Sequence, residues 1–125
     1  MTPTGRLSKM KPQYIDLKYL HEISGGEKDL ILEMISIFNT EVLDYLSLMN
    51  SLLEEKNWDS LGKLAHKAKA SASIMGMKQL TNDLRDLELL AKENKDSELY
   101  SYYIKIIKNQ FISAIEELKL ISKDL

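Results

Sequence analysis

The residues of this chain best suited to chemistry are His66 and Lys69, three positions apart in the alanine-rich stretch of residues 61–76. Residues three apart in a helix lie on neighbouring turns of one side, so the lysine places a fixed positive charge beside the imidazole. An imidazole can act as a nucleophile or carry a proton. Such chemistry requires that elements of the chain hold this pair in a fixed position.

The stretch that carries His66 predicts an amphipathic helix. At about 100° per residue, its apolar side chains fall within roughly 60° of Leu61, whereas His66 falls at roughly 140°. The apolar stripe consists of Leu61, Leu64, Ala65, Ala68, Ala72 and Met75. The neighbours expected on the histidine's side are Gly62, Lys69, Ala70 and Ser73, most of which are small. Another protein could thus approach the ring, although a solvated histidine without a role fits the same geometry.

Length and composition are those of one ordinary globular domain. The chain has 125 residues, of which 44% are hydrophobic and 29% charged. Its net charge of −2 leaves no basic excess for binding nucleic acid. The sequence has no apolar run long enough to cross a membrane, no signal peptide and no cysteine, which favours a cytoplasmic location without a membrane partner.

Four long segments have helical period and none alternates with period two. The sequence therefore predicts an all-α fold, an antiparallel up-down-up-down four-helix bundle with a short extra N-terminal helix. The short helix is expected over 15–23, and the others over about 27–55, from 57–59 to 76, over about 78–92, and from 96–97 almost to the end. Residues 14–125 would form this one domain, after a disordered leader or linker over residues 1–13.

Helix ends are predicted from capping residues. Asp16 is expected to cap the short helix, Asn57 or Asp59 the His66 helix, and Asp96 or Ser97 the last helix. Glycines after Ser24 and at Gly76 are expected to end two helices. Trp58, at the start of the His66 helix, is interpreted as a core anchor.

The second helix carries more apolar residues than one buried stripe requires. Leu30, Met34 and Ile37 lie beside its main stripe. Such a surface is covered by another element or offered to a partner. The short N-terminal helix and a partner protein are both left open as its cover.

Known metal and nucleotide motifs are missing from the sequence. Di-iron bundles need a Glu three residues before a His, and neither His21 nor His66 has one. There is also no glycine-rich phosphate-binding loop. The sequence therefore predicts no metal ligands, no cofactor and no enzyme with its own ATP site.

Three stretches together resemble the histidine-containing phosphotransfer (HPt) domains of two-component phosphorelays, over roughly residues 14–120. The opening, from Ile15 through Ser24-Gly-Gly-Glu27 to Phe38, is similar to that of the family. Leu64-Ala65-His66-Lys67-Ala68-Lys69-Ala70-Ser71-Ala72 resembles the family's Ala-His-x-x-Lys-Gly-Ser/Ala core. Gly76, Leu80 and Leu87-Glu88 follow at the family's spacing.

The resemblance implies that His66 accepts a phosphoryl group from a receiver-domain aspartyl phosphate, or from a histidine kinase, and passes it to the receiver aspartate of a response regulator. It places Lys69 near the phosphoryl oxygens. It makes Glu88 the acceptor of a hydrogen bond from Nδ1–H, which leaves Nε2 as the nucleophile. Glu88 lies roughly 80° from Leu80 around its helix, at the edge of the buried stripe, from which it can reach the neighbouring helix.

The partners implied are receiver domains of response regulators or hybrid histidine kinases, which would bring the Mg²⁺ ion. Gly62, Ala70 and Ser73 are the residues expected to contact them. Ala70 stands where the family usually has glycine, and Ala68 where it usually has a larger apolar residue. The methyl group of Ala70 bears on how closely a receiver loop can approach the imidazole.

Two other classes of function are kept beside phosphotransfer. One is a binding module, a pseudo-HPt domain that docks and sequesters a receiver without transfer, which the methyl group of Ala70 favours. The other is a structural bundle, such as an oligomerisation segment, in which His66 has no role. An acid-labile phosphohistidine would separate phosphotransfer from both.

Overall fold

The computed structural model describes residues 14–125, and the regular elements of this part of the chain are all helices. They are α2 (Lys18–Ser24), α3 (Lys28–Glu54), α4 (Trp58–Ile74), α5 (Lys78–Lys92) and α6 (Tyr100–Asp124), with the 3-10 turn η1 (Ser97–Leu99) before α6. The predicted all-α bundle with a short extra helix is confirmed. The leader or linker expected over residues 1–13 lies outside the described residues.

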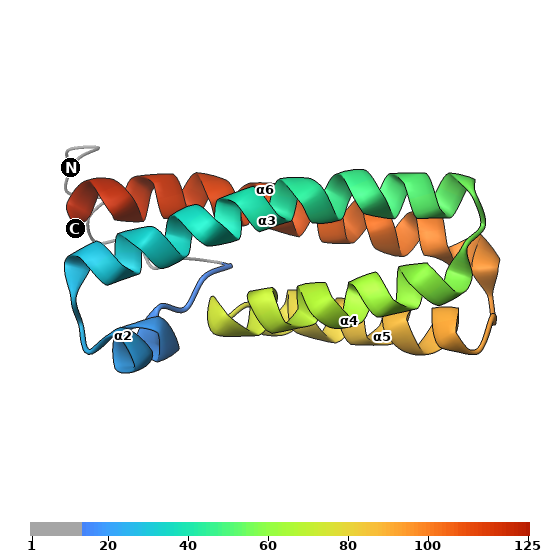
Figure 1. Ribbon diagram of the computed structural model, residues 1–125, viewed down its shortest axis with the longest axis horizontal. Helices are drawn as coiled ribbons and strands as arrows, with labels where there is room; N and C mark the ends of the chain where they lie inside the picture. The colour runs from blue at the N-terminus through green and yellow to red at the C-terminus, as the bar shows by residue number, and fades with distance from the viewer. Residues whose placement is uncertain (1–13) are drawn as a thin grey trace, which may run out of the picture.

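The four long helices run antiparallel (Figure 1). The two longest, α3 and α6, lie side by side, and α4 and α5 form a shorter hairpin against them (Figure 1). Because α3 extends beyond the α4–α5 turn, space remains at that end of the bundle, and α2 lies there (Figure 1). His66, in the middle of α4, is thus carried by the shorter hairpin.

The core consists of one apolar stripe from each long helix, to which Ile15 and Leu20 at the N-terminal end are added. Its fully buried members include Val42, Met49, Leu61, Ala65, Leu84, Leu87, Ile107 and Phe111. At the start of α4, the ring of Trp58 meets Tyr100 edge to face, with 4.9 Å between ring centroids and an interplanar angle of 86°. Aromatic pairs favour this geometry, which agrees with the interpretation of Trp58 as a core anchor.

The ends of α4 follow the sequence prediction. The Asn57 side chain accepts a hydrogen bond from the backbone N–H of Ser60 (3.3 Å), which satisfies one of the unpaired donors of the first turn. Gly76 has a φ of 68° just after the helix and so turns the chain toward α5. Small residues on one side of α4 allow it to pack closely and extensively against α5.

Two local expectations are decided by packing. Asp96 has a φ of 52° and its side chain makes no capping hydrogen bond, because η1 leads into α6 in place of a capped first turn. Ile37 is 52% exposed, so α2 leaves this part of the extra apolar surface of α3 uncovered, whereas Met34 is half-buried.

A short N-terminal segment crosses the α4–α5 turn. The backbone N–H of Asp16 donates to the Met75 carbonyl oxygen (2.9 Å), and the N–H of Tyr14 donates to the carboxylate of Glu117 on α6 (2.9 Å). The crossing is so close that a Cβ atom on Gly76 would lie 2.6 Å from the Cβ atom of Asp16 and would overlap its carbonyl oxygen. Gly76 is therefore needed both for its positive φ and for this approach.

Gly76→Ala is expected to lower the free energy of unfolding by about 2–3 kcal/mol, because it combines a strained φ with a steric overlap. Denaturant unfolding would measure the loss. Gly25→Ala is the matched control: its φ is 66° and nothing lies within 4 Å of an added Cβ atom. That variant should lose only the conformational part, about 1 kcal/mol. Equal losses in the two variants would show that steric overlap with Asp16 does not contribute to the loss in Gly76→Ala.

Candidate functional site

His66 projects from the outer side of α4, as helical period predicts. Its side chain is 64% exposed. Ala70 and Ser73, which follow it on α4, are exposed as well. The ring can therefore be reached from solvent without any movement of the bundle.

Glu88 orients the ring from the neighbouring helix α5. Its carboxylate oxygen Oε2 lies 2.8 Å from Nδ1 of His66, and the residue is only 4% exposed. An ionised carboxylate can only accept hydrogen bonds, so Nδ1 carries the proton in this pair. The other ring nitrogen, Nε2, then has a free lone pair and is directed away from α5. The contact between His66 and Glu88 that the resemblance implies is present.

Two lysine side chains complete the shell around the Glu88 carboxylate. The Nζ atom of Lys69 donates to Oε1 at 2.8 Å, and the Nζ atom of Lys92 donates to Oε2 at 2.9 Å. Lys69 lies where the sequence analysis expected it, but Lys92 was not among the predicted site residues. The available signal was its position four residues after Glu88 on the same helix, the spacing of an i,i+4 ion pair.

The three donors keep Glu88 ionised despite its burial. Burial by itself raises the pKa of this carboxyl group, because it disfavours the charged form. The hydrogen bonds from Lys69, Lys92 and His66 outweigh burial and lower the pKa to about 2. The carboxylate is thus a charged acceptor for Nδ1–H throughout the neutral range.

Gly62 does not belong to the exposed surface on which the sequence analysis placed it. It is buried against α5, where an added Cβ atom would lie 3.4 Å from Cγ of Lys92 and 3.5 Å from Cβ of Ala91. The angle around α4 was correctly expected, but α5 covers that angle at this level of the bundle. An added methyl group at position 62 would thus make ordinary van der Waals contacts with α5 and with the aliphatic part of Lys92.

A polar contact holds α4 in register with α3. The hydroxyl groups of Tyr45 and Ser71 are 2.9 Å apart, and Ser71 also donates to Glu41 at 3.2 Å. Burial is the main cause that raises the pKa of Tyr45, which therefore stays protonated. This contact is on the α3 side of α4, whereas Glu88 and its lysines are on the α5 side, so both sides of the histidine helix are fixed.

An apolar groove runs beside this contact, between α3 and α4. It is lined by Met34, Ile37, Phe38, Glu41, Ser71, Ile74 and Met75. Ile37 and Leu30 are the exposed members of the extra apolar surface of α3. Because Ile74 follows Ala70 and Ser73 on α4, the groove continues the exposed side that carries His66.

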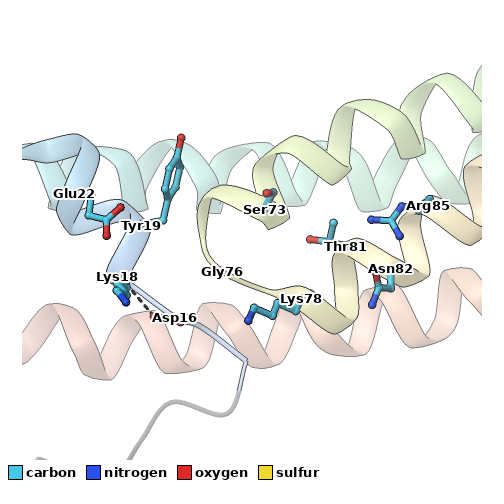
Figure 2. Close-up of a pocket in the computed structure, with 10 residues that line it drawn as sticks. All are labelled: Asp16, Lys18, Tyr19, Glu22, Ser73, Gly76, Lys78, Thr81, Asn82 and Arg85. Carbon is cyan, nitrogen blue, oxygen red and sulfur yellow. Dashed lines mark hydrogen bonds between the residues drawn. The ribbon is translucent and has the colours of Figure 1, made fainter.

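A larger and more polar cleft lies between α2 and the α4–α5 turn (Figure 2). Figure 2 shows Tyr19 and Glu22 on its α2 side, and Lys78 and Arg85 on its α5 side. His66 does not line this cleft, and the charged side chains that do line it are exposed. The cleft is therefore separate from the contact between His66 and Glu88, and it meets the exposed side of α4 at Ser73.

Among residues 14–125, no group of three or more His, Cys, Asp or Glu side chains is arranged to hold a metal ion. In the same part of the chain, no helix has the length and apolar character needed to cross a membrane.

Comparison with known proteins identifies the family. The chain matches the Hpt domain family over residues 33–119, which include His66, Lys69, Glu88 and Lys92. Its fold is similar to the crystal structure of histidine-containing phosphotransfer protein B (HptB) from Pseudomonas aeruginosa PAO1, with a TM-score of 0.81 and 19% sequence identity over 92% of this chain and 99% of that chain. No curated protein matches the chain.

The chain belongs to the Hpt domain family. The fold and the family together define a histidine-containing phosphotransfer carrier of phosphorelays. The resemblance stated from the sequence is thereby confirmed at the level of family and fold.

Proposed function

We propose that His66 is the phosphorylated residue and that this domain takes a phosphoryl group from the aspartyl phosphate of one receiver domain and passes it to the aspartate of another. The observation that carries the proposal is the exposed imidazole whose Nδ1 is held by the buried carboxylate of Glu88 at 2.8 Å. That contact presents Nε2 as the nucleophile and fixes the direction in which it points.

The transfer step balances without a further reactant. The lone pair of Nε2 attacks phosphorus, the N–P bond forms, and the bond from phosphorus to the aspartate oxygen breaks. The receiver aspartate leaves as a carboxylate with that electron pair. Nδ1 keeps its proton, so the ring becomes an imidazolium whose charge Glu88 stabilises. The reverse step returns the phosphoryl group to a receiver.

This chain supplies a rigid nucleophile and positive charge, and the receiver supplies the rest. Phosphoryl transfer depends mainly on in-line positioning and on compensation of charge. Lys69 and Lys92 bring two ammonium groups to the carboxylate that holds the ring. We propose that the receiver brings Mg²⁺ together with its phosphoryl-binding pocket. On this proposal the domain is a phosphocarrier and has no separate enzymatic activity.

The receiver is proposed to dock on a surface formed by Ala70, Ser73 and Ile74 of α4 and Ile37 of α3, here called the receiver-facing surface. These residues are exposed or half-buried and continue from His66 to the apolar groove. An apolar patch next to a reactive group can bury area against a partner while the group stays within its reach. Of the residues that the sequence predicted to contact a receiver, Ala70 and Ser73 belong to this surface, whereas Gly62 is buried and does not.

Ala70→Leu is expected to slow transfer from a receiver by about tenfold or more, because Ala70 lies about 40° from His66 around the helix and one turn further on. A bulky side chain there would obstruct the loop that must reach Nε2. Stopped-flow or gel-based transfer assays with a phosphorylated receiver would measure the rate. Ala70→Gly should raise the rate or the receiver affinity, and should cost up to roughly 1 kcal/mol of helix stability.

Asn109→Leu provides the control for Ala70→Leu. Asn109 is exposed on α6, away from α4, so the added apolar side chain should leave transfer unchanged. Unimpaired transfer by Ala70→Leu would show that the receiver does not dock over this side of α4, and the receiver-facing surface would then be wrong.

The proposal is tested by mixing the protein with purified receiver domains that carry phosphoryl on aspartate, followed by mapping of any phosphoryl group on this chain. An acid-labile group on His66 supports phosphotransfer. Receiver binding without that group would instead support the pseudo-HPt domain, in which the Ala70 methyl group prevents close approach. Neither binding nor phosphorylation, with receivers shown to transfer to another HPt domain, would contradict both.

A further inference from the structure

The Glu88 carboxylate is bound by more cations than its own charge requires. Two ammonium groups and one ring N–H donate to it, all at 2.8–2.9 Å. A single ammonium group would neutralise one buried carboxylate, so the second lysine needs another explanation. The two lysines also differ in the oxygen they bind. Lys92 shares Oε2 with Nδ1 of His66, whereas Lys69 binds Oε1.

The lysines further differ in the helix from which they come. Lys92 and Glu88 are both on α5, one turn apart, and form an i,i+4 pair. Lys69 and His66 are both on α4, again on neighbouring turns. A group added to the imidazole therefore stays close to the lysine of α4, while the carboxylate stays close to the lysine of α5.

We propose that Lys92 is a positioning residue for phosphotransfer: it keeps Glu88 on Nδ1 of His66 while Lys69 leaves Oε1 for the phosphoryl group on Nε2. The inference rests on the proposed phosphorylation of His66. In the free protein both lysines bind the carboxylate of Glu88. In the phosphorylated protein Lys92 still binds the carboxylate, and Lys69 binds the phosphoryl group.

The charges of the site fit this exchange. A phosphoryl group brings up to about two negative charges, and the ring that carries it gains one positive charge. With both lysines, the excess positive charge of the free site is then compensated on phosphorylation. Without Lys92, Lys69 would have to serve two anions, and the imidazolium would be the one remaining cationic partner of the buried carboxylate whenever Lys69 binds the phosphoryl group. A buried carboxylate that loses a charge-assisted hydrogen bond is less stable in its position.

The packing around Lys92 supports a fixed position for its ammonium group. Its Cγ atom lies over Gly62, where no side chain occupies the space between α4 and α5. A methyl group at position 62 would only reach van der Waals contact with this Cγ atom, at 3.4 Å, whereas a side chain larger than alanine would displace the stem of Lys92. The side chain of Lys92 is nevertheless 53% exposed, compared with 26% for Lys69, so its removal leaves no cavity in the core.

The test compares Lys92→Gln with Lys95→Gln as the matched control. Lys95 also forms an ion pair with a glutamate, Glu93, at 3.0 Å, but does not contact Glu88. For each protein we would measure the ¹⁵N chemical shifts of the His66 ring, the dissociation constant for a receiver, and the rate of transfer from the phosphorylated receiver. The lifetime of the phosphoryl group on His66 would be measured after the receiver is removed.

The unphosphorylated Lys92→Gln protein should keep the Nδ1–H tautomer, since Lys69 still holds Glu88. Its transfer rate should fall about tenfold and its phosphoryl group should be lost several times faster, which corresponds to one charge-assisted hydrogen bond. The receiver dissociation constant should not change. Lys92→Arg should restore the rate to within about twofold, because the guanidinium also donates to a carboxylate. Lys95→Gln should behave as wild type.

Three outcomes would overturn the assignment of Lys92 while leaving the proposed function intact. They are a transfer rate for Lys92→Gln equal to that of Lys95→Gln, loss of the Nδ1–H tautomer already in the unphosphorylated variant, and a weaker receiver affinity that accounts for the whole loss of rate. If wild type acquires no phosphoryl group from any phosphorylated receiver, the proposed function fails, and the role of Lys92 fails with it.

Discussion

His66→Gln is expected to abolish phosphoryl acceptance completely and to leave the bundle folded. A glutamine amide has no nucleophilic nitrogen, so no N–P bond can form at this position. The fold should tolerate the change because the side chain is 64% exposed, and such substitutions usually alter stability by about 0.5 kcal/mol or less. Lys69 and Lys92 continue to bind Glu88 in the variant, so its buried charge stays paired. Intact-mass measurement after incubation with a phosphorylated receiver, together with circular dichroism, would check both parts.

His21→Gln is the control for this prediction. His21 is the only other histidine of the chain and is exposed on α2. It does not belong to the Glu88 cluster, which consists of Glu88, His66, Lys69 and Lys92. Its replacement should leave phosphorylation unchanged. Loss of phosphorylation in His21→Gln, with acceptance retained in His66→Gln, would show that the reactive residue has been wrongly assigned.

Glu88→Ala should have the second largest effect, a loss of about 10²-fold in transfer rate with a much smaller change in receiver affinity. The carboxylate orients the ring before reaction and stabilises the imidazolium that forms, so its contribution grows toward the transition state. It is buried behind the ring and offers little surface to a receiver. Single-turnover transfer and a binding titration would separate rate from affinity.

Glu88→Gln refines the same prediction. The amide oxygen can still accept the hydrogen bond from Nδ1–H but carries no charge, so the ring keeps its orientation and loses electrostatic stabilisation. The transfer rate of this variant should lie between those of wild type and Glu88→Ala. Equal losses of affinity and of rate in Glu88→Ala would make Glu88 a residue that contacts the receiver and would contradict its role behind the ring.

Acid titration tests the Glu88 cluster independently of any receiver. The pKa of Glu88 is lowered in the folded protein from 4.5 to about 2, so the carboxylate contributes stability that is fully present above the ordinary value. That contribution is lost as the pH falls from about 4.5 toward 2. Wild type should therefore lose stability across this window more steeply than Glu88→Gln, as urea unfolding would measure. Parallel pH dependence in the two proteins would show that the ion pairs do not stabilise the fold.

Features that depend on neighbours along the chain could be predicted from the amino-acid pattern alone. Asn57 and Gly76 delimit α4 through capping and a positive φ, both of which act within one turn of the helix. The exposure of His66 follows from its angle to the apolar stripe, since the whole stripe is buried together. Helical period also predicted the bundle, because four apolar stripes on consecutive helices have few other ways to be buried.

The contacts between side chains of neighbouring helices depend on how the helices pack, which the sequence pattern does not specify. The rotation of α5 against α4 buries Gly62 and brings Lys92 to the carboxylate of Glu88, and no pattern within either helix specifies that rotation. The position of α2 is another example, because the hydrogen bond from Asp16 to Met75 ties its start to the α4–α5 turn. Ile37 consequently stays exposed next to the histidine helix. Periodicity reports the angle of a residue around its own axis, whereas a site built from two helices also depends on their separation and relative rotation, which packing of the whole core sets.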